Sequence, residues 1–414
     1  MSAAADCAPR ELDVAIVGGG LVGASLALAL GDAGVRTLLV ESVPFGSRAQ
    51  PSFDERTTAL GNASRRIFGA LGVWETMAAE AGVIRSIHVS DAGRFGFARL
   101  EAAEHGIEAF GYVVPNRTLG AALWGRLGAL NHLTLRVPAT VSALEIEPLR
   151  VRLSVQADGA APELFQARLL VGADGAHSQV RAAAGLAAQI EDYHQSALVA
   201  NVACDAAPPG RAFERFTGAG PLALLPLASG DRAVIWACTP EHARRLLALD
   251  ERCYLAELQR TFGWRAGRFL RAGSRSAYPL QLTRAGTAIA TRTVLIGNAA
   301  QALHPVAGQG FNLGLRDAAL LAELVAADPL AAGTAQQLQR FASARAADRA
   351  GVVRFTDSLV RLFADGRPGV ALLRDLGLLA FDLAPPAKRA LARISAGFAG
   401  PSPRLARGLS VRRD

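Results

Sequence analysis

The sequence predicts an α/β fold built on a parallel sheet, because strands, glycine-rich turns and helices alternate near both ends of the chain. Near the N-terminus, an apolar run over 12–17 predicts a buried strand, and a glycine turn leads from it into a helix over 21–33. Later in the chain, an apolar run over 293–296 leads into a glycine-rich stretch over 297–312 and a helix over 313–326. A strand that turns through glycines into a helix is the unit from which parallel sheets are built.

The first glycine turn has the spacing GxGxxG, formed by Gly18, Gly20 and Gly23. Glycines at these positions let the backbone approach a pyrophosphate, and the N-terminus of the following helix attracts negative charge. A second strand over 35–41 ends in Glu41, where a carboxylate is placed to bind ribose hydroxyls. The unit therefore predicts a dinucleotide site. The alternative is a turn that only packs the helix tightly against the strand.

The stretch 297–312 predicts a further anion site by the same physical argument. Unpaired backbone N–H groups and the positive end of a helix converge at such a turn. A lone site of this kind discriminates little between functions. Two of them, far apart in the sequence, favour one large anionic cofactor that contacts both.

Composition narrows the class of protein. The chain of 414 residues is long enough for two domains and a helical tail. Its net charge of +8 is carried almost wholly by arginine, and no basic block alternates with aromatic residues, so we expect no nucleic-acid partner. The cysteines and histidines form no ligand pattern, which predicts no metal site and reduced thiols in a cytosolic protein. The cysteines are Cys7, Cys204, Cys238 and Cys253.

The middle of the chain predicts a mostly antiparallel β insertion. Alternating apolar and polar residues over 133–153 predict a hairpin, and 167–171 predicts a short buried strand. From 197 to 280 short strands alternate with turns, with one helix around 240–262. The strands are expected over 198–204, 212–216, 222–227 and 233–238. An antiparallel sheet laid over a cofactor domain would form a roof above a substrate.

After the second glycine stretch the sequence becomes helical, since apolar residues recur at helical spacing over 352–363 and 372–383. Two interpretations are open. The apolar stripes pack into a core, or they form an amphipathic surface that docks on a membrane with the help of arginines. The arginines concerned are Arg354, Arg361, Arg389 and Arg393.

Together these motifs resemble the group A flavoprotein aromatic hydroxylases and, within them, the ubiquinone-biosynthesis hydroxylases. The resemblance spans nearly the whole chain. It rests on the first glycine turn with Glu41, on Asp174-Gly175 and on the stretch 297–312. Asp174-Gly175 also has a plainer interpretation, as a turn from strand to helix that the aspartate caps.

Two departures from the family pattern narrow the resemblance. The family usually has an aspartate and a histidine where Asn298 and Gln301 stand here. These replacements, with the segments 210–216, 276–280 and 356–360, are similar to the branch that hydroxylates a polyprenyl methoxyphenol. A sister hydroxylase of the same pathway is the alternative.

The resemblance implies a fold like that of p-hydroxybenzoate hydroxylase. That fold has a Rossmann-like FAD-binding domain, an inserted, mostly antiparallel β-sheet substrate domain and a C-terminal helical segment. The FAD-binding domain would comprise 10–75, 107–182 and 276–340, the substrate domain 76–106 and 183–275, and the C-terminal helices 341–414.

The resemblance also implies roles for individual residues. Gly308, Gln309 and Gly310 would present backbone N–H groups to the flavin ring, which is anionic there when reduced, and Pro305 would shape the substrate side. FAD would contact Gly18, Gly20, Gly23, Glu41, Arg56, Arg117, Asp174, Gly175, Asn298, Gly310, Phe311 and Asn312. No general base is assigned. The candidates Tyr193, His194 and Tyr278 each have a structural alternative, as does His304, which adjoins Pro305.

The implied reaction is the hydroxylation of a phenol ring, made electron-rich by loss of its hydroxyl proton, through a flavin C4a-hydroperoxide. It needs FAD, O2 as co-substrate, and NAD(P)H or another electron donor. The polyprenyl tail of the phenol would need an apolar channel. Residues that either line this channel or form ordinary sheet core are Phe213, Phe216, Leu224, Leu225 and Trp236.

The resemblance further implies partners and a location. The polyprenylated phenol, a ubiquinone-biosynthesis protein complex and a membrane surface are the expected partners, for a cytoplasmic protein held on the inner face of the bacterial plasma membrane. Two other classes stay open. One is a different FAD oxidoreductase that shares the first glycine turn, and the other is a non-catalytic flavin subunit of a quinone-synthesis complex.

Overall fold

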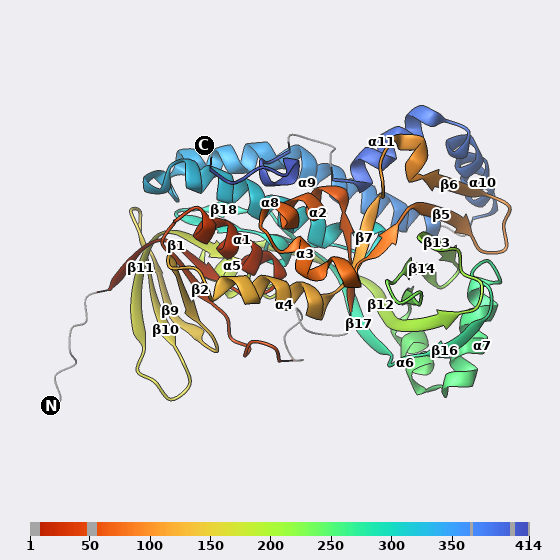
Figure 1. Ribbon diagram of the computed structural model, residues 1–414, viewed down its shortest axis with the longest axis horizontal. Helices are drawn as coiled ribbons and strands as arrows, with labels where there is room; N and C mark the ends of the chain where they lie inside the picture. Colours follow the sequence, from red (N-terminus) through yellow and green to blue (C-terminus); the bar gives the residue numbers. More distant parts are fainter. Residues whose placement is uncertain (1–8, 48–55, 365–366, 398–401, 413–414) are drawn as a thin grey trace.

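The computed structural model describes residues 9–47, 56–364, 367–397 and 402–412, so Cys7 lies outside the described residues. Two large sheets lie along the longest axis of the molecule, with helices packed around them (Figure 1). In the first sheet five strands run parallel in the order β19-β11-β1-β2-β8. They are β1 (Arg10–Val17), β2 (Thr37–Val40), β8 (Leu133–Arg136), β11 (Glu163–Gly172) and β19 (Thr293–Leu295).

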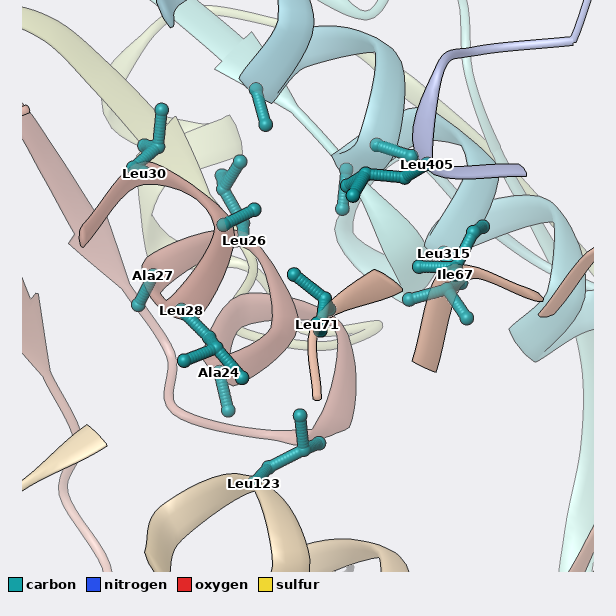
Figure 2. Packing of buried hydrophobic residues seen from close by; sticks show 14 of the residues in the cluster. Ala24, Leu26, Ala27, Leu28, Leu30, Ile67, Leu71, Leu123, Leu315 and Leu405 are labelled. Carbon is teal, nitrogen blue, oxygen red and sulfur yellow. The ribbon is translucent and has the colours of Figure 1, made fainter. Parts of the chain in front are cut away.

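The first βαβ unit forms where the glycine spacing predicts it. α1 (Leu21–Asp32) connects β1 to β2, and it is buried on every side because apolar residues surround the helix instead of forming one stripe. Figure 2 shows its side chains packed among leucines of other helices, such as Leu123 of α4 (Asn116–Leu127) and Leu315 of α8 (Gln309–Ala327). The core around α1 therefore joins segments from distant parts of the sequence.

The second sheet is mostly antiparallel, in the order β20-β17-β12-β15-β14-β13-β5-β6, with β13 and β5 as a parallel pair. Its strands are β5 (Ser86–Asp91), β6 (Phe97–Glu101), β12 (Ala188–Cys204), β13 (Arg211–Thr217), β14 (Gly220–Pro226), β15 (Arg232–Cys238), β17 (Ser276–Ala285) and β20 (Gln301–Ala302). A small third sheet, β3 (Thr57–Gly61), β7 (Gly111–Pro115) and β4 (Gly82–Ile84), is separate from both. The predicted fold class is confirmed.

The helix predicted around 240–262 is in fact two helices, α6 (Pro240–Ala248) and α7 (Glu251–Phe262). The break has a local cause. Asp250 adopts an extended backbone, and its side chain accepts a hydrogen bond from the Cys253 N–H at 2.7 Å, which caps a new helix.

The hairpin predicted over 133–153 is displaced along the chain. β8 pairs parallel with β2, so it belongs to the main sheet. The hairpin itself is formed by β9 (Thr140–Ile146) and β10 (Val151–Gln156). Alternation of apolar and polar residues indicates strands, but it does not indicate which strands pair.

Three helices follow α8: α9 (Ala335–Ala364), α10 (Pro368–Asp382) and α11 (Pro385–Ser395). α9 packs beside α8 and continues toward the second sheet, where α10 lies against β6 (Figure 1). Within the described ranges, no helix has both the length and the apolar character needed to cross a bilayer.

Candidate active site

A cavity of about 1680 Å³ opens between the two large sheets. Both glycine-rich turns line it on one side, the inner face of the second sheet lines it on another, and side chains of α9, α10 and α11 complete its wall. Pockets for drug-sized ligands measure roughly 300–1,000 Å³. This cavity is therefore large enough for a bulky cofactor together with a second ligand.

The first glycine turn leaves backbone groups open to the cavity. Gly18 has φ +103°, and a Cβ there would lie 2.4 Å from the Ala173 carbonyl oxygen. α1 begins at Gly20 without a side-chain cap and without an acid in its first turn, so its N–H groups face the cavity as a positive end. Gly23 instead serves packing, since a Cβ on it would meet the Gly18 carbonyl oxygen at 1.9 Å. Gly18 and Gly23 thus both allow close packing of the backbone, and this packing leaves the N-terminus of α1 open to the cavity.

Glu41 lies at the end of β2, buried, and lines the cavity. Its carboxylate accepts hydrogen bonds from the backbone N–H of Gly19 at 2.6 Å and of Val43 at 2.8 Å. These two bonds fix the orientation of the carboxylate at the place where the sequence predicts a ribose contact.

The second glycine stretch contains the start of a helix. α8 begins at Gln309, four residues earlier than the predicted start at 313, so Gln309 and Gly310 belong to its first turn. Gly308 precedes it in the left-handed conformation with φ +59°, and this helix also lacks a side-chain cap and an acid in the first turn. Two uncapped helix N-termini, those of α1 and α8, thus face the same cavity.

Asn312 ties this turn to the rest of the protein. Its Oδ1 accepts from the Gly61 N–H at 2.8 Å and from the Ser64 hydroxyl at 2.6 Å. Its Nδ2 donates to the carbonyls of Ala59 at 2.8 Å and Gly308 at 2.7 Å. Phe311 and Asn312 both line the cavity, but the side chain of Asn312 is fully engaged in holding the protein backbone.

The two departures from the family pattern lie in different surroundings. Asn298 is exposed and lines the cavity, so its amide is available to a ligand. Gln301 is buried, and its Nε2 lies 3.4 Å from Oδ2 of Asp317. Asp317 also pairs with Arg345 at 2.6 Å and with Arg349 at 2.8 Å. Gln301 therefore belongs to a buried ionic network behind the turn.

Asp174 and Gly175 line the cavity, yet the Asp174 carboxylate has a structural role. It accepts hydrogen bonds from the Ser178 hydroxyl at 2.5 Å and from the Gln179 N–H at 2.7 Å, which caps α5 (Gln179–Ala183). The capping interpretation accounts for the side chain. A ligand at this turn would meet its backbone.

The two arginines predicted to contact FAD differ in their position relative to the cavity. Arg56 lines the cavity, with its guanidinium 4.6 Å from the ring centre of Tyr278. Arg117 is half-exposed and pairs with Glu80 at 2.7 Å, and it is not among the cavity-lining residues that the structure describes. The structure therefore brings Arg56 to the site but does not bring Arg117 there.

His304 is buried and neutral. Its Nδ1 accepts from the Val306 N–H at 3.2 Å, and its Nε2 lies 3.2 Å from Oε1 of Gln195, which requires the proton to be on Nε2. Burial lowers the pKa of His304 to about 4. The histidine thus holds the loop that carries Pro305, which lines the cavity.

The three candidates for the general base lie at different distances from the cavity. Tyr278 lines the cavity, whereas Tyr193 and His194 are not among its described lining residues. Tyr193 packs edge-on against His304, and burial raises its pKa to about 12. His194 is exposed at a bulge of β12.

The predicted channel residues lie on two faces of the second sheet. Phe216 and Leu225 line the cavity, while Leu224 and Trp236 are fully buried in the core between the sheet and its helices. Phe213 belongs to that core and also reaches the cavity wall. Sequence reasoning missed Glu214, which lies between Phe213 and Phe216 and also lines the cavity. An acid within an otherwise alternating strand was the signal that could have identified it.

Comparison with known proteins agrees with this geometry. A family model described as FAD binding domain matches residues 11–356. The chain belongs to this FAD-binding family. The open helix ends, the oriented carboxylate of Glu41 and the volume of the cavity fit FAD, so the donor groups that the family requires are present in this chain. The protein is an FAD-dependent monooxygenase by class.

Curated relatives cover nearly the whole chain. Ubiquinone hydroxylase UbiL of Rhodospirillum rubrum is 38% identical over 98% of this chain and 94% of its own length. The 3-demethoxyubiquinol 3-hydroxylase of Escherichia coli is 33% identical over 94% of this chain and 99% of its own. Within the FAD-binding family, the chain therefore groups with ubiquinone hydroxylases.

Solved structures share the fold. The p-nitrophenol 4-monooxygenase of Pseudomonas putida superimposes with a TM-score of 0.78 at 19% identity, covering 94% of this chain and 99% of that one. A probable FAD-dependent monooxygenase of Pseudomonas aeruginosa, pqsL, gives a TM-score of 0.70 at 23% identity, covering 90% of this chain and all of that one. At such identities the likeness is one of architecture.

Proposed function

We propose that this protein is an FAD-dependent ring hydroxylase that acts on a polyprenyl methoxyphenol in ubiquinone biosynthesis, of the 2-octaprenyl-6-methoxyphenol 4-hydroxylase type. The observation that carries the proposal is one cavity in which two uncapped helix N-termini face a predominantly apolar sheet. The helix ends suit an anionic cofactor. The apolar face suits an aromatic ring with a hydrocarbon tail. The names of the curated relatives support the pathway.

FAD would lie along the two turns. Gly18 and Gly20 would admit the pyrophosphate, Glu41 would accept from the ribose, and Asn298 would contact the middle of the cofactor. The backbone of Gly308, Gln309 and Gly310 would face the flavin ring. Residues 10–75, 107–182 and 276–340 would then form the FAD-binding domain, with 76–106 and 183–275 over the substrate and 341–414 as C-terminal helices.

When bound and reduced, FAD supplies the activation of O2 that ring hydroxylation requires. One oxygen atom would enter the ring and the other would leave as water, with two reducing equivalents taken from NAD(P)H or another donor. The protein's own contribution is to exclude water, to orient the ring and to accept its phenolic proton. The helix dipole at Gly308 would favour negative charge beside it.

A hydrocarbon tail has a place in the cavity. Phe355, Leu359 and Phe363 of α9 line its wall, and Phe363 stacks on Phe216 of the sheet with ring centres 3.4 Å apart. Outside the cavity, α10 exposes apolar side chains to solvent, with Leu373 70% and Leu376 50% exposed. We infer that this helix touches the membrane surface from which a polyprenylated substrate would enter, on the cytoplasmic side and near other proteins of the pathway.

Deletion of the gene, followed by analysis of the quinone precursors, tests the proposal. Accumulation of 2-octaprenyl-6-methoxyphenol, or its homologue with another tail length, is the expected result. Accumulation of a later, demethoxylated precursor would assign the protein to a sister step. Unchanged quinone and no precursor, in a strain without a second hydroxylase, would reject the proposal. Purified protein that binds FAD but hydroxylates no prenylphenol would instead favour a non-catalytic flavin subunit.

A further inference from the structure

Glu214 is an acid in the middle of an otherwise apolar sheet face. Along β13, Ala212, Glu214 and Phe216 line the cavity, while Phe213, which also reaches the cavity wall, and Arg215 make their contacts on the opposite face. There, Phe213 meets Phe262 of α7 edge-on at 5.5 Å, and Arg215 donates to the Thr261 carbonyl at 3.3 Å. The alternation of the strand thus directs the Glu214 carboxyl into the cavity.

The strand register surrounds this carboxyl with hydrocarbon. Glu214 pairs with Val89 of β5 on one side and with Ala223 of β14 on the other. The same row continues to Ala98 of β6 and Ile235 of β15, and all of these residues line the cavity. None of them can form a hydrogen bond through its side chain. An acid kept in such a place is costly to stability and is typical of a functional position.

Among the described residues, the Glu214 carboxyl has no hydrogen-bond or ion-pair partner. Burial alone raises its pKa to about 7, without a contribution from a neighbouring charge. The charged groups on the packed strands are engaged elsewhere, since His88 contacts Arg265 and Asp91 pairs with Arg374. Further pairs on the surrounding strands and helices are Arg211 with Glu101, Arg361 with Asp357, and Lys388 with Glu104.

Most other titratable groups that line the cavity have defined partners, and His177 is exposed in the turn before α5. Glu41 is held by backbone N–H groups, Asp174 caps α5, and His304 is locked between a backbone N–H and Gln195. The ring of Tyr278 lies under the guanidinium of Arg56. Of the acids that line the cavity among the described residues, Glu214 is the one that lies in the sheet.

We propose that Glu214 is the general base that takes the phenolic proton from the substrate, an inference that rests on the function proposed above. In this step the phenol O–H bond breaks, its electron pair stays on the ring oxygen, and a new O–H bond forms on the carboxylate. The ring becomes electron-rich, and the carboxylic acid returns its proton to water after product leaves. Because the apolar wall makes this carboxylate more basic than usual, its pKa lies closer to that of a phenol, about 10.

The test compares wild type with Glu214→Gln and Glu214→Asp in the FAD-loaded protein. The substrate is a 2-methoxyphenol that carries one short prenyl group. We expect Glu214→Gln to keep its FAD content and to be at least as stable as wild type, but to lose kcat by about 10²–10⁴-fold. It should also lose the acid limb of the pH–kcat/KM profile near pH 7. Glu214→Asp should recover part of the rate. Val89→Ala, one strand away in the same row, is the matched control and should change KM without moving this limb.

Retention of kcat within about threefold by Glu214→Gln, with the acid limb intact, would overturn the inference. A second measurement tests the role of Glu214 without depending on hydroxylation, and so separates this inference from the proposed function. A prenylated nitrophenol bound by wild type should show more of the visible phenolate band than the same probe bound by Glu214→Gln. If wild type hydroxylates no prenylphenol, the proposed function fails. Equal phenolate bands in the two proteins would then reject the role of Glu214 as well.

Discussion

Asn312 holds Gly308 in the left-handed conformation from which α8 begins, through a hydrogen bond of 2.7 Å from its Nδ2 to the Gly308 carbonyl. The same amide binds Ala59 and Gly61 of β3, so one side chain sets the distance between β3 and the N-terminus of α8. Because the side-chain amide of Asn312 is engaged by the protein, the predicted contact of Asn312 with a cofactor would be made by other atoms of the residue.

Replacement of Asn312 by alanine should loosen this N-terminus. Four hydrogen bonds would be lost at a buried position. Buried groups left unsatisfied cost about 1–3 kcal/mol each, so we expect the free energy of unfolding to fall by roughly 3 kcal/mol. FAD affinity, followed by flavin fluorescence, should fall at least about tenfold. Gln339→Ala, at an exposed amide on α9, should change neither quantity.

Gly308→Ala and Gly310→Ala should have opposite effects on stability. At Gly308 the positive φ of +59° disfavours any side chain, and a Cβ would lie 3.1 Å from that of Ala59. At Gly310, inside the helix, the nearest atom to an added Cβ is 3.9 Å away. We expect Gly308→Ala to lose about 1–2 kcal/mol in urea unfolding of the FAD-free protein and Gly310→Ala to gain up to about 1 kcal/mol. Equal losses in both variants would contradict this account.

His304 should make the protein less stable in mild acid. Its pKa is about 4 when folded and 6.5 as a free side chain, so between these values the unfolded chain binds more protons. Stability is therefore fully present above pH 6.5 and falls as the pH drops toward 4. Denaturant unfolding across this window should show a shallower pH slope for His304→Gln than for wild type. His88, whose pKa is also lowered to about 4 by burial, should supply part of the slope that persists.

Glu214 should make the free energy of unfolding depend on pH in the opposite sense to His304. This can be measured without an enzymatic assay. Its pKa rises from 4.5 to about 7 on folding, so the folded state favours the protonated acid. The stability that this group contributes is complete below pH 4.5 and is lost as the pH rises through about 7. Glu214→Gln should consequently be more stable than wild type on the alkaline side and similar to it in acid. Identical curves of stability against pH for wild type and Glu214→Gln would show that the Glu214 carboxyl is solvated.

The pair of Asp91 on β5 and Arg374 on α10 should fasten the C-terminal helices to the second sheet. Both side chains are buried, 8% and 6% exposed, and the Arg374 Nε lies 2.8 Å from Oδ2 of Asp91. Asp91→Ala removes the carboxylate that neutralises a buried guanidinium, for which we expect a loss of about 3–5 kcal/mol. Hydrogen exchange in α10 should rise. Glu241→Ala, which breaks the exposed pair with Arg244, should leave the free energy of unfolding nearly unchanged.

The sequence predicted the first glycine turn and Glu41 well because their geometry is local, set by one strand, one helix and the next strand. The start of α8 was placed too late because glycine and asparagine have weak helix propensity. The stabilising partners of Asn312 lie some 250 residues away, at Gly61 and Ser64, and no local pattern reveals them.

Glu214 shows a different limit. Alternation along β13 indicates that the side chains of Glu214 and Phe213 lie on opposite faces of the strand. It does not indicate which face borders the cavity, because this depends on the pairing of β13 with β5, more than a hundred residues earlier. The pairing of β13 with β14 and of β14 with β15 places Leu224 and Trp236 on the core face, while Phe216 lines the cavity. Arg117 was assigned by resemblance alone, and its ion pair with Glu80 directs it elsewhere.

The wall formed by α9, α10 and α11 has a consequence for the basicity of Glu214. Phe355, Phe381 and Leu391 of these helices line the same cavity as Glu214. The apolar surroundings of this carboxyl therefore include side chains that lie more than a hundred residues later in the sequence. Displacement of these helices would admit water to the sheet face, and Glu214 would become a weaker base.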